Sequence, residues 1–196
     1  MLYLIWSERY IQMTKVLAVT GYKSFELGIQ SEKDPRIVII KKALEKKLIG
    51  LLEEGLEWVI VSGQLGVELW CVEVCLDLQE QYNFQIGIIA PFEDQDSRWK
   101  ETDQEKYQLL TMTVDYFNTL YQGGYKNPGQ FKMKNQFFLS KADASLVLID
   151  DDHPGSVKFY VEALEKEPNH PMFTITPLDL EDIGRELQEL AEFDAQ

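Results

Sequence analysis

The chain has 196 residues, of which 45% are hydrophobic and 12% aromatic, and its formal net charge is −14. This length fits one globular domain, and the aromatic content excludes a wholly disordered chain because it can fill a core. The acidic balance argues against nucleic acid and anionic membranes as partners, and no apolar run approaches the roughly 20 residues that span a bilayer. A small anionic ligand remains compatible with this charge, since backbone N–H groups at a helix start can bind one locally.

The predicted domain begins at Met13, which leads directly into a β-rich run. Residues 1–12 contain a short apolar run with neither basic residues before it nor a small-residue cleavage site, which argues against a secretory signal. We therefore interpret residues 1–12 as an N-terminal extension outside the fold, and residues 13–196 as a single domain.

Strands and helices alternate along this domain. Short apolar runs that end at glycine, proline or turn residues indicate strands, and apolar residues at three- and four-residue spacing indicate helices. In chain order the expected elements are a strand at Val16–Thr20, a helix at 35–54, a strand at Trp58–Val61, a helix at 65–76, a strand at 86–90, a short helix at 104–110, a strand at 114–118, a helix at 130–140, a strand at 145–149, a helix at 156–166, a strand at 172–176 and an acidic helix at 180–190.

The strands are continuously apolar rather than alternating, which is typical of a parallel sheet buried on both faces. Repeated strand–helix units with right-handed crossovers then predict an α/β fold: a Rossmann-like, doubly wound, mainly parallel sheet with helices on both faces. No internal repeat or low-complexity linker divides the chain.

The two cysteines, Cys71 and Cys75, are four residues apart in a predicted helix and lie near one apolar stripe. We interpret them as core thiols, because no nearby cysteine or histidine completes a zinc set and two cysteines build no disulfide framework. A metal or redox pair is the alternative. No metal site is predicted, and the expected location is a reducing compartment, the cytoplasm.

Candidate ligand-binding residues gather after three predicted strands, at the carboxyl ends where open α/β sheets bind ligands. The first loop (residues 20–23) offers Gly21, Tyr22 and Lys23; the second loop (62–68) offers Ser62, Gly63, Gln64, Gly66 and Glu68; the third loop (150–158) offers Asp150, Gly155, Ser156 and Lys158. Each residue has an ordinary structural alternative, and their shared position at strand ends is what favours a site.

The second loop carries the most information. Gly63 and Gly66 permit a tight strand-to-helix turn whose N–H groups can hold a phosphate, and Glu68 in the first helical turn could accept a ribose hydroxyl. The alternative is that the glycines end a strand and Glu68 offsets the helix dipole. Neither the dinucleotide fingerprint nor the P-loop is present.

The other two loops repeat the pattern more weakly. Gly155 and Ser156 could form a phosphate-binding turn beside Lys158, or Ser156 could cap an ordinary helix that carries a solvated lysine. Asp150 could orient a ligand hydroxyl or be an ordinary turn aspartate. The tyrosine and lysine of the first loop could stack on and pair with a nucleotide, or form an exposed turn.

Four stretches of the chain are similar to distinctive stretches of the YpsA-type proteins of Gram-positive bacteria: KVLAVTGYK (15–23), FELG (25–28), SGQLGVELW (62–70) and FKMKNQFF (131–138). The resemblance covers nearly everything after Met13. That family is placed in the SLOG superfamily of Rossmann-like domains, which includes the DNA-uptake protein DprA and the LOG cytokinin-activating phosphoribohydrolases. The resemblance implies a pocket for a nucleotide or nucleotide-derived ligand such as ADP-ribose or an NAD-like molecule, and a link to cell division or stress.

The same resemblance bears on enzyme activity. LOG hydrolases carry a Glu-Arg-Lys run on the helix before the late strand, then a glycine-rich loop with a following glutamate. Here residues 133–136 are MKNQ, so the arginine is missing, residues 150–156 lack the repeated glycines, and Glu162 is only a loose counterpart of the glutamate. The resemblance therefore does not extend to the charge stabilisation and positioned carboxylate that N-glycosidic cleavage needs.

Three functions follow as hypotheses. The favoured one is a cytoplasmic protein that binds or senses a nucleotide-derived ligand and whose bound state alters an unknown protein partner. The second is an enzyme that hydrolyses or transfers at a ribosyl bond, with Glu68 as the candidate carboxylate. The third is an interaction scaffold that acts through its acidic surface and C-terminal helix, and apolar helix positions could also serve a homo-oligomer. No cofactor is predicted beyond that nucleotide-derived ligand.

Overall fold

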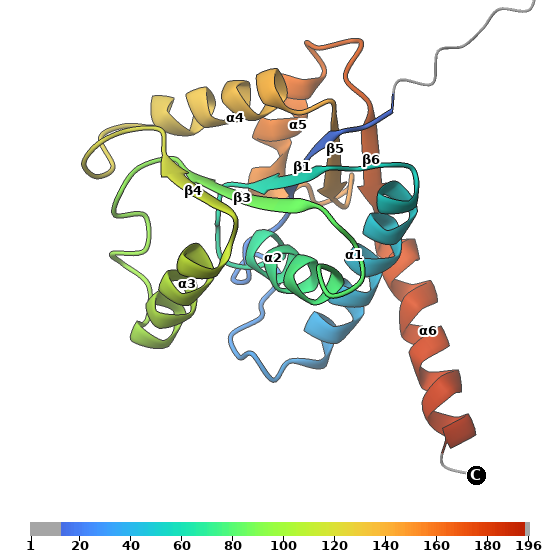
Figure 1. Ribbon diagram of the computed structural model, residues 1–196. Coiled ribbons are helices and arrows are strands. Elements are labelled where there is room, and N and C mark those ends of the chain that lie inside the picture. Colours follow the sequence, from blue (N-terminus) through green and yellow to red (C-terminus); the bar gives the residue numbers. More distant parts are fainter. Residues whose placement is uncertain (1–12, 195–196) are drawn as a thin grey trace, which may run out of the picture.

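A six-stranded sheet forms the centre of the computed structural model, which describes residues 13–194 and is drawn in Figure 1. Every strand pairing is parallel, and the strand order is β4-β3-β2-β1-β5-β6. The strands are β1 (Val16–Thr20), β2 (Trp58–Val61), β3 (Gln85–Ala90), β4 (Tyr116–Thr119), β5 (Ala144–Leu148) and β6 (Met172–Ile175). The predicted Rossmann-like α/β fold is confirmed.

Helices cover both faces of this sheet (Figure 1). They are α1 (Pro35–Glu53), α2 (Val67–Leu78), α3 (Glu101–Thr113), α4 (Gly129–Lys141), α5 (Lys158–Leu164) and α6 (Pro177–Asp194). On one face α2 packs between α1 and α3, and α6 packs against α1, whereas α4 and α5 pack together on the other face. The chain runs outward from β1 to β4 and then returns to β5, so the adjacent strands β1 and β5 form the switch point of the sheet.

Local sequence explains where the longest helix begins. The side chain of Asp34 accepts a hydrogen bond from the N–H of Arg36, and Pro35 occupies the first turn, where a missing N–H costs nothing. The apolar positions Ile37, Ile40 and Leu44 then recur at helical spacing and are buried against the sheet side of the helix.

The prediction was less accurate between the third and fourth strands. Helix α3 extends beyond the predicted 104–110 at both ends, and β4 begins two residues later than predicted. The N–H of Val114 still donates to the carbonyl of Leu110. Val114 is therefore the C-cap residue of α3 rather than the first residue of a strand.

The start of α5 also corrects one alternative. Ser156 does not cap that helix, because a short 3-10 turn at Gly155–Val157 comes first and α5 begins at Lys158. The N–H and the hydroxyl of Ser156 both donate instead to the carboxylate of Glu26, 130 residues away in the chain. The conformation of this turn therefore depends on the long-range contact between Ser156 and Glu26, which no local sequence pattern reveals.

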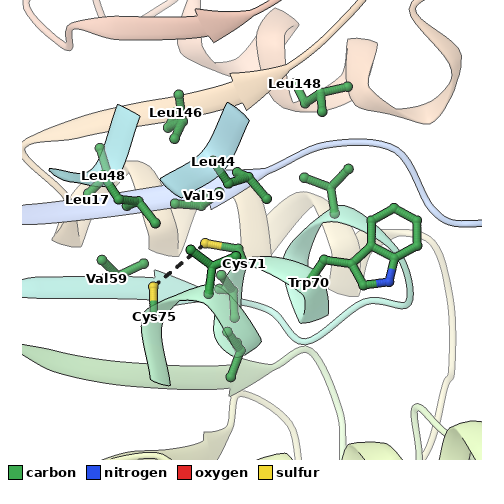
Figure 2. Close-up of a cluster of buried hydrophobic side chains, with 14 of the residues drawn as sticks. Leu17, Val19, Leu44, Leu48, Val59, Trp70, Cys71, Cys75, Leu146 and Leu148 are labelled. Carbon is green, nitrogen blue, oxygen red and sulfur yellow. Dashed lines mark hydrogen bonds between the residues drawn. The ribbon is translucent and has the colours of Figure 1, made fainter. Parts of the chain in front are cut away.

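The core lies on both faces of the sheet, and on the face covered by α1 and α2 Figure 2 shows Cys71 and Cys75 among large apolar side chains. Both thiols are fully buried, and their sulfur atoms are 3.9 Å apart. Burial raises the pKa of the Cys75 thiol well above its ordinary value, which keeps it protonated and unreactive. The interpretation of these cysteines as core thiols is therefore confirmed.

The predicted extension at residues 1–12 lies outside the described residues. From residue 13 to residue 194, no helix is both long enough and apolar enough to cross a bilayer.

Candidate ligand-binding site at the strand ends

The three predicted loops meet at the switch point of the sheet. The first loop follows β1 and the third follows β5, its immediate neighbour, while the second follows β2 on the other side of β1. Ligands of open α/β sheets bind at this position because the connections diverge there toward opposite faces. The topology therefore brings together segments that are more than 120 residues apart in the chain.

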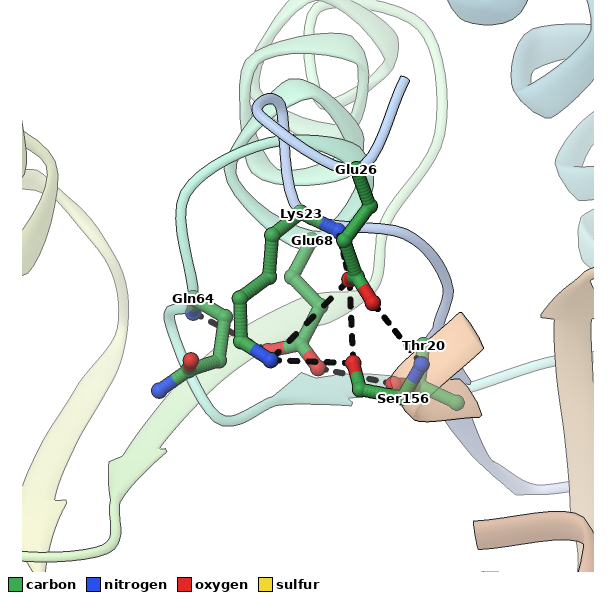
Figure 3. Close-up of polar contacts among 6 residues, drawn as sticks. All are labelled: Thr20, Lys23, Glu26, Gln64, Glu68 and Ser156. Carbon is green, nitrogen blue, oxygen red and sulfur yellow. Dashed lines mark hydrogen bonds and ion pairs between the residues drawn. The ribbon is translucent and has the colours of Figure 1, made fainter. Parts of the chain in front are cut away.

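Glu68 fills the concave side of the second loop. Its Oε2 accepts hydrogen bonds from the N–H of Ser62 (2.9 Å), the hydroxyl of Ser62 (2.7 Å) and the N–H of Gln64 (3.1 Å), as Figure 3 shows in part. Its Oε1 accepts from the hydroxyl of Thr20 at 2.8 Å, and the residue is only 3% exposed. The carboxylate thus occupies the kind of N–H cradle that was predicted for a phosphate.

The glycines of the first two loops permit a close approach between two protein segments. A Cβ on Gly66, where φ is +103°, would lie 2.5 Å from the backbone nitrogen of Ser24 and 2.6 Å from the carbonyl oxygen of Tyr22. A Cβ on Gly21 would lie 2.7 Å from the Val67 side chain. These glycines are needed for the packing of the first loop on the start of α2, a role that the sequence alternatives did not include.

A second carboxylate fills the third loop in the same way. Glu26 Oε1 accepts from the N–H of Ser156 at 2.7 Å, and Oε2 accepts from the hydroxyl of Ser156 and the N–H of Lys23, each at 2.9 Å. Burial raises the pKa of Glu26, but the hydrogen bonds from Lys23 and Ser156 outweigh it and leave the pKa below its ordinary value. Sequence reasoning missed this role, although Glu26 stands in the conspicuous FELG stretch.

Two lysine ammonium groups stand close to these carboxylates. Lys23 Nζ donates to the hydroxyl of Ser156 at 2.9 Å and lies 4.0 Å from Glu26 Oε2 (Figure 3). Lys134 comes from α4 on the opposite face and is half-buried, with no ion pair among the described residues. Burial lowers its pKa, the charge of Glu68 opposes this, and the charge of Lys23 adds to it.

Lys134 belongs to the FKMKNQFF stretch, and the sequence pattern does not single it out as a site residue. Its signal in the sequence was its place on the helix where the resemblance expected an arginine. Lys134 thus supplies a positive charge on the helix where the family resemblance found no matching arginine.

Tyr22 holds the third loop to the first. Its hydroxyl accepts from the N–H of Asp150 at 2.8 Å and donates to the carbonyl of His153 at 2.7 Å. Burial raises the pKa of this phenol, whose residue is 6% exposed. The ring is therefore committed to packing, rather than being an exposed turn residue, and it lines a small cavity of about 200 Å³ together with Glu26 and Asp150.

Gln95 is a further residue that sequence reasoning missed. Its buried side-chain nitrogen donates to the carbonyls of Ser62 and Gly63 and to the hydroxyl of Tyr107, and its oxygen accepts from the side chain of Gln64. No local pattern marks it, because it stands in the irregular segment after β3. It fixes the outer side of the second loop.

The structure brings together all the predicted site residues except one. Lys158 is exposed, its ammonium lies 5.1 Å from the Phe159 ring, and it takes no part in the contacts that join the loops. The larger cavity, of about 520 Å³, lies between α1 and α6 and includes none of the predicted residues. Among the described residues, no three acidic, cysteine or histidine side chains form a group suited to a metal ion.

Comparison with known proteins gives a consistent picture. A family model, YpsA, described as the YspA SLOG family, matches residues 17–183. A UPF0398 protein of Oceanobacillus iheyensis is 49% identical over 175 residues, which is 89% of this chain and 95% of that protein. A UPF0398 protein of Bacillus cereus is 46% identical over 178 residues, 89% of this chain and 97% of that protein.

Two solved structures share the fold at low sequence identity. DNA processing protein A of Helicobacter pylori, described in its single-stranded DNA binding mode, matches with a TM-score of 0.53 and 12% identity over 89% of this chain and 81% of that one. The protein of the same name from Streptococcus pneumoniae matches with a TM-score of 0.55 and 14% identity, and this chain spans 56% of it. At such identities the likeness shows the fold alone.

Proposed function

The chain belongs to the YpsA SLOG family, and we propose that it binds or senses a nucleotide or nucleotide-derived anion, such as ADP-ribose, at the ends of β1, β2 and β5. The cytoplasm remains the expected location, and an altered contact with a protein partner remains the expected consequence of binding.

Lys134 is the observation that carries this proposal. Its ammonium is half-buried, its pKa responds to the charges of Glu68 and Lys23, and none of the ion pairs among the described residues includes it. A half-buried ammonium that forms no ion pair is costly, and an anionic ligand would supply one in addition to the more distant charge of Glu68. Lys23 would be the second cation, since its bond to Ser156 places it at the same strand ends.

The state of Glu68 favours binding over catalysis. Its carboxylate already accepts four hydrogen bonds from protein groups and is almost fully buried. A carboxylate so occupied has little capacity left to attack or deprotonate a substrate. Its proposed role is to shape the second loop, while hydrolysis at a ribosyl bond stays the enzyme alternative.

A thermal-shift titration with ADP-ribose, NAD and AMP tests the proposal. A ligand at 100 times its dissociation constant should raise the melting temperature by about 5–10 °C. We expect Lys134→Met to remove most of that shift and Lys158→Met, a matched change on an exposed lysine, to preserve it. Absence of a shift with every nucleotide would contradict the proposal.

Two further arms separate the alternatives. Release of free base from AMP, followed by chromatography and lost in Glu68→Gln, would favour the enzyme. Binding of a single-stranded oligonucleotide, motivated by the fold shared with DNA processing protein A, would favour a nucleic-acid role. We expect neither, because Glu68 is occupied and the net charge of −14 opposes polyanions.

A further inference from the structure

Three aromatic rings form a cluster beside the candidate site. The rings of Phe92, Tyr125 and Phe131 have pairwise centroid distances of 5.7, 5.7 and 5.9 Å. Phe92 is buried at the base of this aromatic cluster, whereas Tyr125 is 51% exposed and Phe131 is 36% exposed. Two large rings are thus supported from beneath and present surface to solvent.

Buried polar contacts hold the cluster in place. The Gln130 side chain is 4% exposed, and its oxygen accepts from the N–H groups of Lys126 and Asn127 while its nitrogen donates to the carbonyl of Gly124. These bonds tie the loop that carries Tyr125 to the first turn of α4, which carries Phe131 (Figure 1). The exposed rings are therefore pre-ordered, which reduces the entropy lost when a ligand stacks on them.

The aromatic cluster borders the strand-end loops through two connections. Phe92 follows β3 almost directly, and the same segment contains Gln95, which binds the carbonyls of Ser62 and Gly63 in the second loop. On α4, Phe131 and Lys134 are three residues apart, so their side chains lie on one face of the helix with Cβ atoms about 5–6 Å apart. A ligand that reaches Lys134 therefore has the rings within the length of one nucleoside.

We propose that the aromatic cluster is the subsite for the base of a nucleotide, with the phosphate toward Lys134 and Lys23; this inference rests on the proposed function. A flat base can stack on an exposed aromatic side chain, and each such stack strengthens binding because every base has a π-face. A ribose phosphate without a base would reach only the lysines. The base subsite therefore makes a base-bearing ligand bind more tightly than its bare sugar phosphate.

Isothermal titration with AMP, GMP, CMP and UMP against ribose 5-phosphate tests this assignment. We expect one or more of the four nucleotides to bind about tenfold more tightly than ribose 5-phosphate. Phe131→Ala and Tyr125→Ala should each remove most of that advantage and leave ribose 5-phosphate binding unchanged. Phe131→Tyr should retain it, and Phe193→Ala, on an exposed ring of α6, is the control that should change neither ligand.

The outcomes separate the two proposals. If ribose 5-phosphate binds and no nucleotide exceeds it, or if the alanine variants keep the nucleotide affinity, the base subsite is wrong and the anion site stands. If Lys134→Met weakens nucleotide and sugar phosphate equally while Phe131→Ala weakens only the nucleotide, both proposals are supported. If none of the five compounds binds to the folded wild-type protein, the base subsite as proposed is wrong; the proposed function fails with it only if ADP-ribose and NAD also give no thermal shift.

Discussion

The second and third loops each bind a glutamate carboxylate, but the two glutamates lie at different distances along the chain from the loops that they bind. In each a glutamate carboxylate accepts bonds from the loop, but Glu68 lies within six residues of both of its backbone donors, while Glu26 binds the N–H of Lys23 nearby and that of Ser156, 130 residues away. Glu68 is buried, whereas the side chain of Glu26 keeps 14% of its surface exposed. The comparison indicates that the second loop is held by a buried carboxylate and that the contact of the third loop with Glu26 is the more accessible of the two.

Removing each carboxylate gives the largest expected contrast. Glu68→Ala should lower the free energy of unfolding by about 3–5 kcal/mol, because it leaves buried donors on Thr20 and Ser62 unpaired. Glu26→Ala should cost about 1–2 kcal/mol, since water can reach the donors it leaves. Urea titration measures both, with the exposed Glu80→Ala as the control. Equal losses for the two carboxylates would break the comparison.

Substitution of the glycines in the second and third loops should give a similar contrast in stability, with smaller losses. Gly66→Ala should destabilise by about 3–4 kcal/mol, because φ is +103° and the new Cβ meets the backbone of the first loop. Gly155→Ala should cost about 1–2 kcal/mol, since φ is +52° and its nearest neighbour is the movable carboxylate of Glu26 at 2.9 Å.

Gly28→Ala is the control for positive φ without crowding, because a Cβ there meets no atom within 4 Å and only the backbone term of about 1 kcal/mol remains. The measurement is again urea unfolding. If Gly66→Ala and Gly28→Ala lose the same stability, the close approach of the first two loops is not what requires Gly66.

Acid should weaken the contact between Glu26 and the third loop, and this effect on stability should be the smallest of those predicted. The pKa of Glu26 in the folded protein lies below the ordinary value of 4.5, so the ionised carboxylate stabilises the fold above that pH. This contribution is lost as the pH falls through the lower folded pKa. Glu26→Gln should therefore lose less stability than wild type between about pH 7 and about pH 3 in urea titrations. An equal or larger loss in the variant would contradict the role given to Glu26.

Much of the fold could be predicted from the sequence because its signals are local. Apolar runs such as Val16–Thr20 and Trp58–Val61 mark strands that are buried on both faces, and their bounds agree with the structure. Val114 was misplaced because β-branched character also suits a strand, and only the bond from its N–H to Leu110 shows that α3 is still ending there.

The candidate site could be predicted in position but not in its contacts. The sequence shows which loops follow strands and which of them contain glycine, and the carboxyl ends of parallel strands share one edge of the sheet. That the loops after β1, β2 and β5 are neighbours follows only from the strand order in the structure. Glu26, Gln95 and Lys134 were missed because nothing in their neighbourhoods in the chain says which loop they will face. Lys158 was included for the opposite reason: it is near Ser156 in the sequence, yet its ammonium lies over Phe159.

The sequence by itself determined the α/β fold, the ends of the strands at which a site would lie and the resemblance to a family, because periodicity, turn residues and distinctive stretches are properties of neighbouring residues. Only the tertiary structure decided that two glutamates occupy the predicted N–H cradles and that a half-buried lysine, Lys134, lies within the electrostatic influence of Glu68. The physical reason is that hydrogen bonds and burial join segments far apart in the chain, and electrostatic balance depends on that proximity rather than on sequence order.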